Sequence, residues 1–147
     1  MPTPAKIDLV FDPRARASYR IWTHVPIRFA DQDPLGHVNN AAIGVYFEQS
    51  RCEHLLPAVR AAGGPHVDFV LARILIDFVK EIRYPGAVDV GLAITRLGNK
   101  SFTLQNGVFQ GGVCHATAEA TLVFFDTQSR ASIAPDTVVR QAHQRFQ

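Results

Sequence analysis

The chain has 147 residues, of which 47% are hydrophobic and 19% charged, and its formal net charge at pH 7 is +2. This size and composition fit one globular domain and exclude a disordered chain, while the small charge does not indicate nucleic-acid binding. No stretch approaches the ~20 apolar residues that span a bilayer, and the N-terminus lacks an apolar run of signal-peptide length. We therefore expect one cytoplasmic domain over residues 1–147, with no membrane or nucleic-acid partner.

The first part of the chain predicts a lead-in and then a strand. Residues 1–17 contain three prolines and mixed charge, which predicts an extended lead-in. Residues 19–29 alternate with period two, and the side chains from Tyr19 to Phe29 at odd positions should share one face. Because Pro26 has no N–H to donate, this strand should lie at a sheet edge or carry a bulge.

A long helix should follow. Asn39 or Asn40 can cap a helix that runs to about Ala62, where Gly63-Gly64-Pro65 stops it. Its first two turns are apolar nearly all round, which predicts a buried helix.

After the helix the hydrophobic period becomes two. The expected strands cover residues 70–82, 88–94, 102–108 and 114–124, and in the first of them Val70, Ala72, Ile74, Ile76, Phe78 and Ile82 should line one face. Short turns containing glycine join the last three strands into an antiparallel meander. Pro135 and Asp136 predict a short helix over residues 135–146. The predicted class is α+β, an antiparallel sheet of five to six strands wrapped around one long central helix.

The loop before the central helix carries the densest set of reactive side chains. It reads Arg28-Phe-Ala-Asp31-Gln-Asp33-Pro34-Leu-Gly36-His37-Val-Asn39-Asn40. The free N–H groups and positive potential of a helix N-terminus can polarise a carbonyl oxygen, and a nearby carboxylate can attack that carbonyl or activate water against it. Asp33 precedes Pro34 and should stay extended beside the helix, although an aspartate in this position can also simply cap a turn. Asp31 is more naturally a partner of loop N–H groups or of Arg28 than of Asp33.

These residues resemble a known family. The string from Asp33 to Asn40 followed by Tyr46-Phe47-Glu48, together with Ile76-Asp77-Phe78 and the hairpin from Arg96 to Phe102, is similar to the hotdog-fold thioesterases of the 4-hydroxybenzoyl-CoA thioesterase type. The resemblance covers roughly Tyr19 to Asp126. It implies hydrolysis of acyl-CoA thioesters by a homodimer or homotetramer, with active sites between subunits and with coenzyme A as part of the substrate rather than a cofactor.

The resemblance also assigns roles to residues. Asp33 corresponds to the catalytic carboxylate, as nucleophile or general base, and the main-chain N–H of Asn40 corresponds to the donor that polarises the thioester carbonyl. His37 could act as an acid or orient the substrate, and Glu48 is the reserve carboxylate, with Arg51 as its natural partner. Gly36 and Asn39 should lie against the substrate.

Weaker signals in the sequence concern the residues that bind the coenzyme A phosphates and the alternative functions. Arg96, Lys100 and Ser101, with Arg130, are candidates for the phosphates because they lie at strand ends and turns. The pattern of Cys and His residues gives no metal spacing, so no metal is expected. A hotdog enoyl-CoA hydratase or dehydratase and a non-catalytic acyl-CoA-binding protein are the alternatives.

Overall fold

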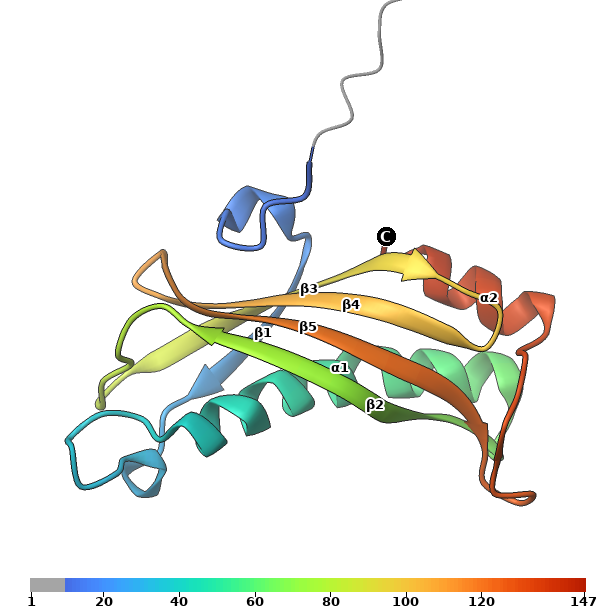
Figure 1. The fold of residues 1–147 in the computed structure, drawn as a ribbon, viewed down its shortest axis with the longest axis horizontal. Coiled ribbons are helices and arrows are strands. Elements are labelled where there is room, and N and C mark those ends of the chain that lie inside the picture. Colours follow the sequence, from blue (N-terminus) through green and yellow to red (C-terminus); the bar gives the residue numbers. More distant parts are fainter. Residues whose placement is uncertain (1–9) are drawn as a thin grey trace, which may run out of the picture.

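The computed structural model describes residues 10–147, in which an antiparallel sheet curls around one long helix (Figure 1). The helices are α1 (Asn40–Gly63) and α2 (Thr137–Gln144), with short 3-10 turns η1 (Arg16–Ser18) and η2 (Phe29–Asp31). The strands are β1 (Ile21–Pro26), β2 (Val67–Phe78), β3 (Ala87–Leu97), β4 (Ser101–Gln110), β5 (Val113–Asp126) and β6 (Ala131–Ser132). The predicted α+β class, with one long helix against the sheet, is confirmed.

The sheet leaves two edges, formed by β1 and β2. Its strand order is β1-β3-β4-β5-β2, every neighbouring pair is antiparallel, and β6 adds a short pairing to the end of β5. Pro26 lies in the edge strand β1, as its missing N–H predicts. The other edge strand, β2, pairs with β5 alone among residues 10–147, so its outer N–H and C=O groups are free to pair with another strand.

The core lies between the concave side of the sheet and α1. One buried cluster surrounds Ile43 and Phe47 near the start of the helix, and a second surrounds Leu55 and Val59 near its end. The second cluster also takes in Val139 of α2, so α2 closes the end of the molecule opposite the start of α1. The first cluster therefore anchors the end of α1 that carries the loop of reactive residues.

One predicted strand differs from its expected pattern because of an inserted residue. The pairing of β2 with β5 shifts register at Ala72, which forms a bulge, so Val70 and Ile74 lie on opposite faces rather than on one. Ile82 lies beyond the end of β2, although it is buried as expected. A period-two count cannot detect an inserted residue, because the count simply restarts after it.

The strand predicted over residues 19–29 is shorter than expected. Phe29 falls in η2 and is largely exposed, and Tyr19 turns to the convex side of the sheet. There the Tyr19 ring packs edge-on against Trp22 and Phe109, at centroid distances of 5.7 and 5.9 Å. Of the predicted lead-in, residues 1–9 lie outside the described residues, and residues 10–18 fold into a turn and η1 across the convex side.

His143 of α2 is fully buried among aromatic rings. Its ring centroid lies 4.7 Å from that of Phe102 and 4.9 Å from that of Phe124. Its Nδ1 lies 3.3 Å from the carbonyl oxygen of Val139, and its Nε2 has no partner within residues 10–147. Burial lowers the pKa of His143 to about 4, so the folded protein holds a neutral imidazole there.

We expect acid to destabilise the protein through His143. The unfolded chain takes up a proton near pH 6.5, whereas the folded chain does so only near pH 4. Stability is therefore intact above pH 6.5 and falls as the pH drops towards 4, by about 3 kcal/mol from this residue. Urea denaturation from pH 7 to pH 4 measures the loss. The variant His143→Phe should lose distinctly less over that range, and an equal loss would contradict this origin.

Candidate functional site

The loop before α1 is a closed hairpin that the start of the helix completes. The carbonyl of Asp31 accepts a hydrogen bond from the N–H of Asn39 at 2.8 Å, and Gln32 pairs with Val38. The N–H of Asp33 donates to the carbonyl of His37 at 3.0 Å. These main-chain hydrogen bonds fix the positions of Asp33 and His37 relative to the first turn of α1 (Figure 1, cyan).

The carboxylate of Asp33 is held at the tip of this hairpin. Its Oδ1 accepts the N–H of Leu35 at 2.9 Å, and its carbonyl accepts the N–H of Gly36 at 3.0 Å. Gly36 has φ +83°, a left-handed conformation that favours glycine, so its role is to close the turn. The other oxygen, Oδ2, lies 3.7 Å from Nδ1 of His37. One oxygen of Asp33 therefore caps a turn and the other faces the imidazole.

The first turn of α1 presents the main-chain N–H of Asn40 at the same cavity as His37. Asn39 is the N-cap, and its Oδ1 accepts the N–H of Ala41 at 2.8 Å. The N–H of Asn40 has no acceptor within residues 10–147. The helix dipole adds positive potential at the same point. An oxygen with developing negative charge would be stabilised there.

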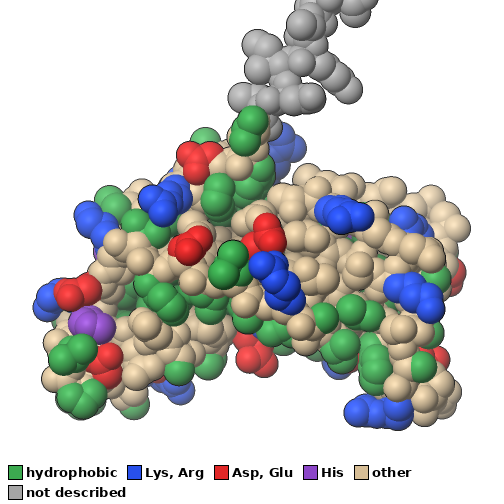
Figure 2. Space-filling view, in the orientation of Figure 1, with side chains coloured by type: hydrophobic (Ala, Val, Ile, Leu, Met, Phe, Trp, Pro, Cys, Tyr) green, Lys and Arg blue, Asp and Glu red, His purple; other side chains and the backbone are tan. Residues whose placement is uncertain are grey.

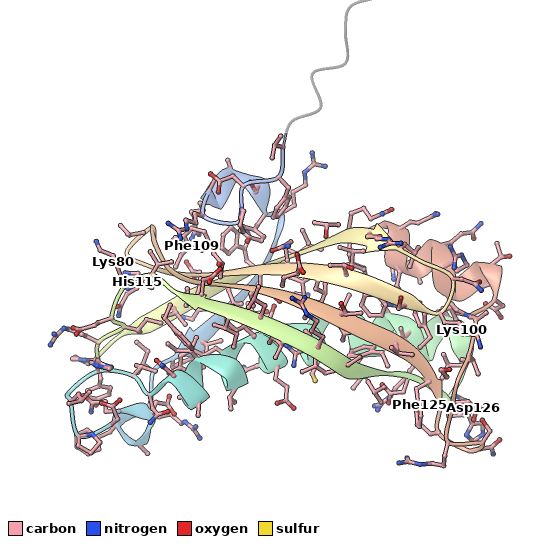
Figure 3. All side chains as sticks on the ribbon, viewed as in Figure 1. Lys80, Lys100, Phe109, His115, Phe125 and Asp126 are labelled. Atoms are coloured by element: carbon pink, nitrogen blue, oxygen red, sulfur yellow. The ribbon has the colours of Figure 1, made fainter. Side chains whose placement is uncertain are left out.

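A cavity of about 270 Å³ opens next to these groups. His37 and Asn40 line one side, and Phe78 and Lys80 at the end of β2 line the other. Figure 3 shows Lys80 and His115 near each other at this end of the sheet, where the N–H of Lys80 donates to the carbonyl of His115. Asp33 is not among the residues that line the cavity, but its Oδ2 lies 3.7 Å from Nδ1 of His37, which does line it. The side chains of Asp33 and His37 are about one-fifth exposed or less.

Asp31 is fully engaged and takes no part in a like-charge pair. Its buried carboxylate accepts hydrogen bonds from the main-chain N–H and the guanidinium of Arg28 and from the hydroxyl of Tyr46. Burial alone would raise the pKa of Asp31, but these hydrogen bonds outweigh it and lower the pKa below its usual value. The expected contact with Arg28 is confirmed.

Glu48 and Arg51 do not form the pair expected of them. Glu48 is exposed on the side of α1 that also exposes Val45, so the helix is not buried all round as its sequence indicates. Arg51 is buried, its Nη1 has no hydrogen-bond partner within residues 10–147, and burial lowers its pKa. The reserve carboxylate therefore lies outside the hairpin site, on the exposed side of the helix.

The phosphate candidates lie at the other end of the sheet. Arg96 is near the end of β3, Lys100 is in the turn, and Ser101 begins β4. The turn is held against α2, because the guanidinium of Arg140 donates to the carbonyl of Gly98 at 2.7 Å. Figure 3 places Lys100 at the end opposite the hairpin. The single chain thus brings together Asp33, Gly36, His37, Asn39 and Asn40 but does not bring the basic candidates to them.

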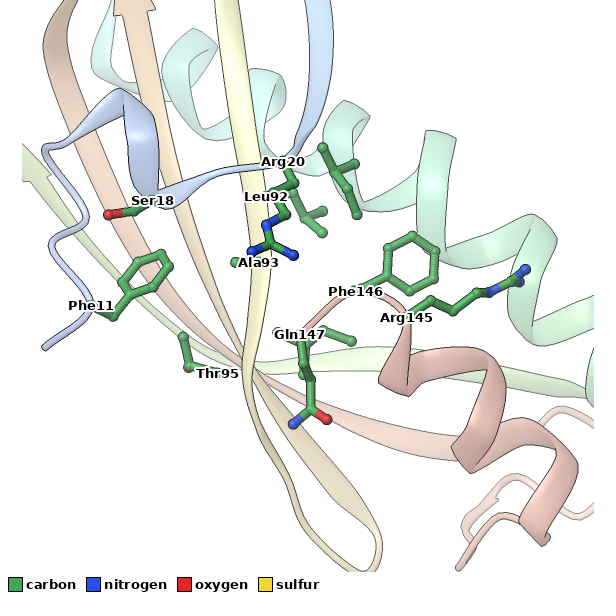
Figure 4. Close-up of a pocket in the computed structure, with 11 residues that line it drawn as sticks. Phe11, Ser18, Arg20, Leu92, Ala93, Thr95, Arg145, Phe146 and Gln147 are labelled. Carbon is green, nitrogen blue, oxygen red and sulfur yellow. The ribbon is translucent and has the colours of Figure 1, made fainter. Parts of the chain in front are cut away.

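A separate cavity of about 410 Å³ lies between the start of β1, β3 and the C-terminal residues (Figure 4). Arg20, Leu92 and Phe146 are among its lining residues. The carbonyl of Phe146 accepts the N–H of Ile94 at 2.7 Å, which closes one side. None of the predicted site residues lines this cavity, so the reactive side chains gather at the hairpin instead.

Sequence reasoning missed two contributors to the site. The helical pattern places Tyr46 among the apolar residues, and the need of a buried phenol for a hydrogen-bond partner is the signal that could have drawn attention to it. The structure identifies that partner as Asp31. Lys80 gives no signal in the sequence, because only the fold brings the end of β2 to the start of α1. No group of three metal-ligating side chains occurs within residues 10–147.

The comparisons with known proteins agree with the fold and give the family. A model of the thioesterase-like superfamily matches residues 27–142, which include the hairpin, helix α1 and strands β2 to β6. The chain belongs to this superfamily. The predicted hotdog fold is confirmed by solved structures with the same arrangement.

Two solved structures are similar in sequence as well as fold. A thioesterase complexed with coenzyme A and zinc from Thermus thermophilus is 27% identical, with a TM-score of 0.73 over 86% of this chain and 98% of that one. A predicted thioesterase from Bacillus stearothermophilus is 26% identical, with a TM-score of 0.76 over 86% and 95%. The uncharacterized protein YsmA of Bacillus subtilis is 25% identical over 71% of this chain and 70% of its own length.

Within the described residues no helix has the length and apolarity to cross a membrane.

Proposed function

We propose that the protein is an acyl-CoA thioesterase that hydrolyses a CoA thioester to the free acid and coenzyme A. The observation that carries the proposal is the grouping, beside a cavity at the start of α1, of Asp33, His37 and the N–H of Asn40, which has no acceptor within residues 10–147. Membership of the thioesterase-like superfamily supports the reaction class. The coenzyme A bound to the Thermus thermophilus relative supports the choice of thiol.

Hydrolysis of a thioester would need only a few groups of the protein. The thioester carbonyl would rest its oxygen on the N–H of Asn40, which stabilises the oxyanion as the carbonyl carbon becomes tetrahedral. Asp33 would either attack the carbonyl to form an anhydride or take a proton from the attacking water. Collapse of the tetrahedral intermediate breaks the carbon–sulfur bond and expels the thiolate. His37, whose Nδ1 lies 3.7 Å from Oδ2 of Asp33, would orient that carboxylate or donate a proton to the leaving sulfur.

Heavy-oxygen water distinguishes the two roles of Asp33. In a single turnover, heavy oxygen in the carboxyl group of Asp33 would mark attack by Asp33, because only an anhydride that water opens at the aspartyl carbon can put the label there. Direct attack by water would put the label in the acid product alone. Mass spectrometry of the hairpin peptide and of the product reads both positions.

Thiol release tests the function itself. A panel of short, long and aryl acyl-CoAs, followed with a thiol-reactive dye, should show turnover of at least one member. Binding of the panel without thiol release would instead indicate a non-catalytic acyl-CoA-binding protein. Addition of water to an enoyl-CoA without thiol release would indicate the hydratase.

We further propose that the working form is a dimer joined along β2. Strand β2, whose outer edge is unpaired within residues 10–147, exposes Val70, Leu71, Leu75 and Phe78. Hydrophobic side chains reach the surface among charged ones on this side (Figure 2). Antiparallel pairing of two β2 edges about a two-fold axis would bring the start of one β2 to the end of the other. The turn of the second protomer that carries its phosphate candidates would then approach the hairpin and the substrate.

Sedimentation measures the assembly. The wild-type chain should sediment as a dimer or a larger assembly, and Leu75→Asp on β2 should dissociate it. Val113→Asp is a matched control, because Val113 is 47% exposed and Leu75 50% exposed, but Val113 lies at the start of β5, away from the free edge. A monomeric wild type, or equal dissociation by both changes, would exclude β2 as the joint.

A further inference from the structure

We propose that Asp31, held by Arg28 and Tyr46, is a positioning residue that fixes the hairpin carrying Asp33 and His37 to helix α1. The proposal rests on the proposed thioesterase function, in which the geometry of the hairpin relative to the start of α1 decides the rate. Neither Asp31 nor Tyr46 lines the cavity beside His37 and Asn40. Their effect would pass through the backbone of the loop.

The Asp31 carboxylate connects η2 to the second turn of α1. Its Oδ2 accepts the hydroxyl of Tyr46 at 2.7 Å, which provides the contact with the helix. Its Oδ1 accepts Nη2 and Nε of Arg28 at 2.7 and 2.9 Å, and its Oδ2 also accepts the main-chain N–H of Arg28 at 2.9 Å. The hairpin therefore cannot slide along the helix without breaking a hydrogen bond to a charged group.

The main chain of Asp31 extends the same connection to the other end of the hairpin. Its carbonyl accepts the N–H of Asn39, the N-cap of α1, at 2.8 Å. Asn39 immediately precedes Asn40, whose N–H is the candidate oxyanion donor. A shift of Asp31 would thus move the donor and the Asp33 carboxylate relative to each other.

Stability alone does not account for this arrangement. Asp31 is 3% exposed, and an ionised carboxylate at such a position costs desolvation that apolar residues of similar volume would avoid. The hydrogen bonds from Arg28 and Tyr46 offset this cost, and they do so at fixed directions. Directional contacts of this kind hold a loop in one geometry, which apolar packing does less well.

Tyr46→Phe tests the proposal against a matched tyrosine. The change removes the hydroxyl that reaches Asp31 but keeps the ring in the core. We expect kcat to fall about 10-fold with KM within about twofold, because a small displacement of reacting groups slows chemistry more than binding. The control is Tyr19→Phe, since Tyr19 is similarly buried and its hydroxyl donates to the carbonyl of Pro13 at 2.8 Å, on the convex side. The control should lose similar stability and keep its kcat.

A double-mutant cycle and hydrogen exchange complete the test. Arg28→Gln and Tyr46→Phe should affect kcat less than additively when combined, because both act through Asp31. The amide of Asn39 should exchange faster in Tyr46→Phe than in Tyr19→Phe. An unchanged kcat and unchanged exchange in Tyr46→Phe, or equal losses in the two tyrosine variants, would overturn the positioning role. If the wild type hydrolyses no thioester, the proposed function fails, and the exchange of the Asn39 amide decides the positioning role independently.

Discussion

Asp33→Asn should lower turnover at least ~100-fold while KM and stability change little. The substitution removes the negative charge that attacks the carbonyl or takes the proton from water. It keeps an oxygen at the position of Oδ1, which accepts the N–H of Leu35 and caps the turn at 2.9 Å, so the hairpin should retain its shape. Steady-state thiol release from the best acyl-CoA of the panel, with a thermal melt of both proteins, measures the two effects separately.

Asp12→Asn is the matched control for this change. Asp12 also caps a turn with the same spacing, since its Oδ1 accepts the N–H of Arg14 at 2.9 Å, but it lies in the segment on the convex side of the sheet. The Asp12→Asn variant should keep wild-type turnover in the thiol-release assay. If Asp33→Asn keeps most of its activity, the role of Asp33 is wrong, and Glu48 on the exposed side of α1 becomes the first carboxylate to substitute.

Phe47→Ala should destabilise the protein by about 3–5 kcal/mol, the largest stability effect that we expect of a single change. Phe47 is fully buried in the cluster that anchors the first half of α1 to the sheet. Removing the ring leaves a cavity that the surrounding strands can close only in part. Chemical denaturation at pH 7 measures the change in unfolding free energy.

The control is an exposed apolar residue. Val138→Ala in α2, where Val138 is 55% exposed, should change the unfolding free energy by less than about 0.5 kcal/mol. A small effect of Phe47→Ala would mean that neighbouring side chains fill the cavity left by the ring. The positions of Asn39 and Asn40 would then not depend on the packing of this cluster.

The elements with clear periodicity could be predicted from the sequence. The helix begins at Asn40 with Asn39 as its cap, and Gly64 ends it with φ +84°, as the Gly63-Gly64-Pro65 stop indicates. Capping and left-handed turns are local, so the residues themselves decide them. The cluster of Asp33, His37 and Asn40 was likewise predictable, because a short loop cannot separate its own members.

Features that depend on contacts between distant segments could not be predicted. The bulge at Ala72 arises in the pairing of β2 with β5. The alternation of residues within β2 carries no information about that pairing. The apolar first turns of α1 predict an enclosed helix in which Glu48 needs Arg51, but the sheet covers one side of α1 and leaves Glu48 in solvent. Lys80 joins the cavity only because β2 ends beside the start of α1.

The Tyr19 ring on the convex side of the sheet limits how copies of this fold can stack. A methyl group at Gly91 would come within 2.4 Å of Cγ of Tyr19, and one at Gly107 within 3.0 Å of its Cε2, so these glycines form a socket for the ring. The segment from residue 10 to residue 20, which carries this ring, lies across part of β3 and β4 and covers it (Figure 1). Back-to-back association of two sheets would thus be confined to the half over β5 and β2, which residues 10–20 leave uncovered and where Arg73 and Glu119 form an ion pair at 3.0 Å.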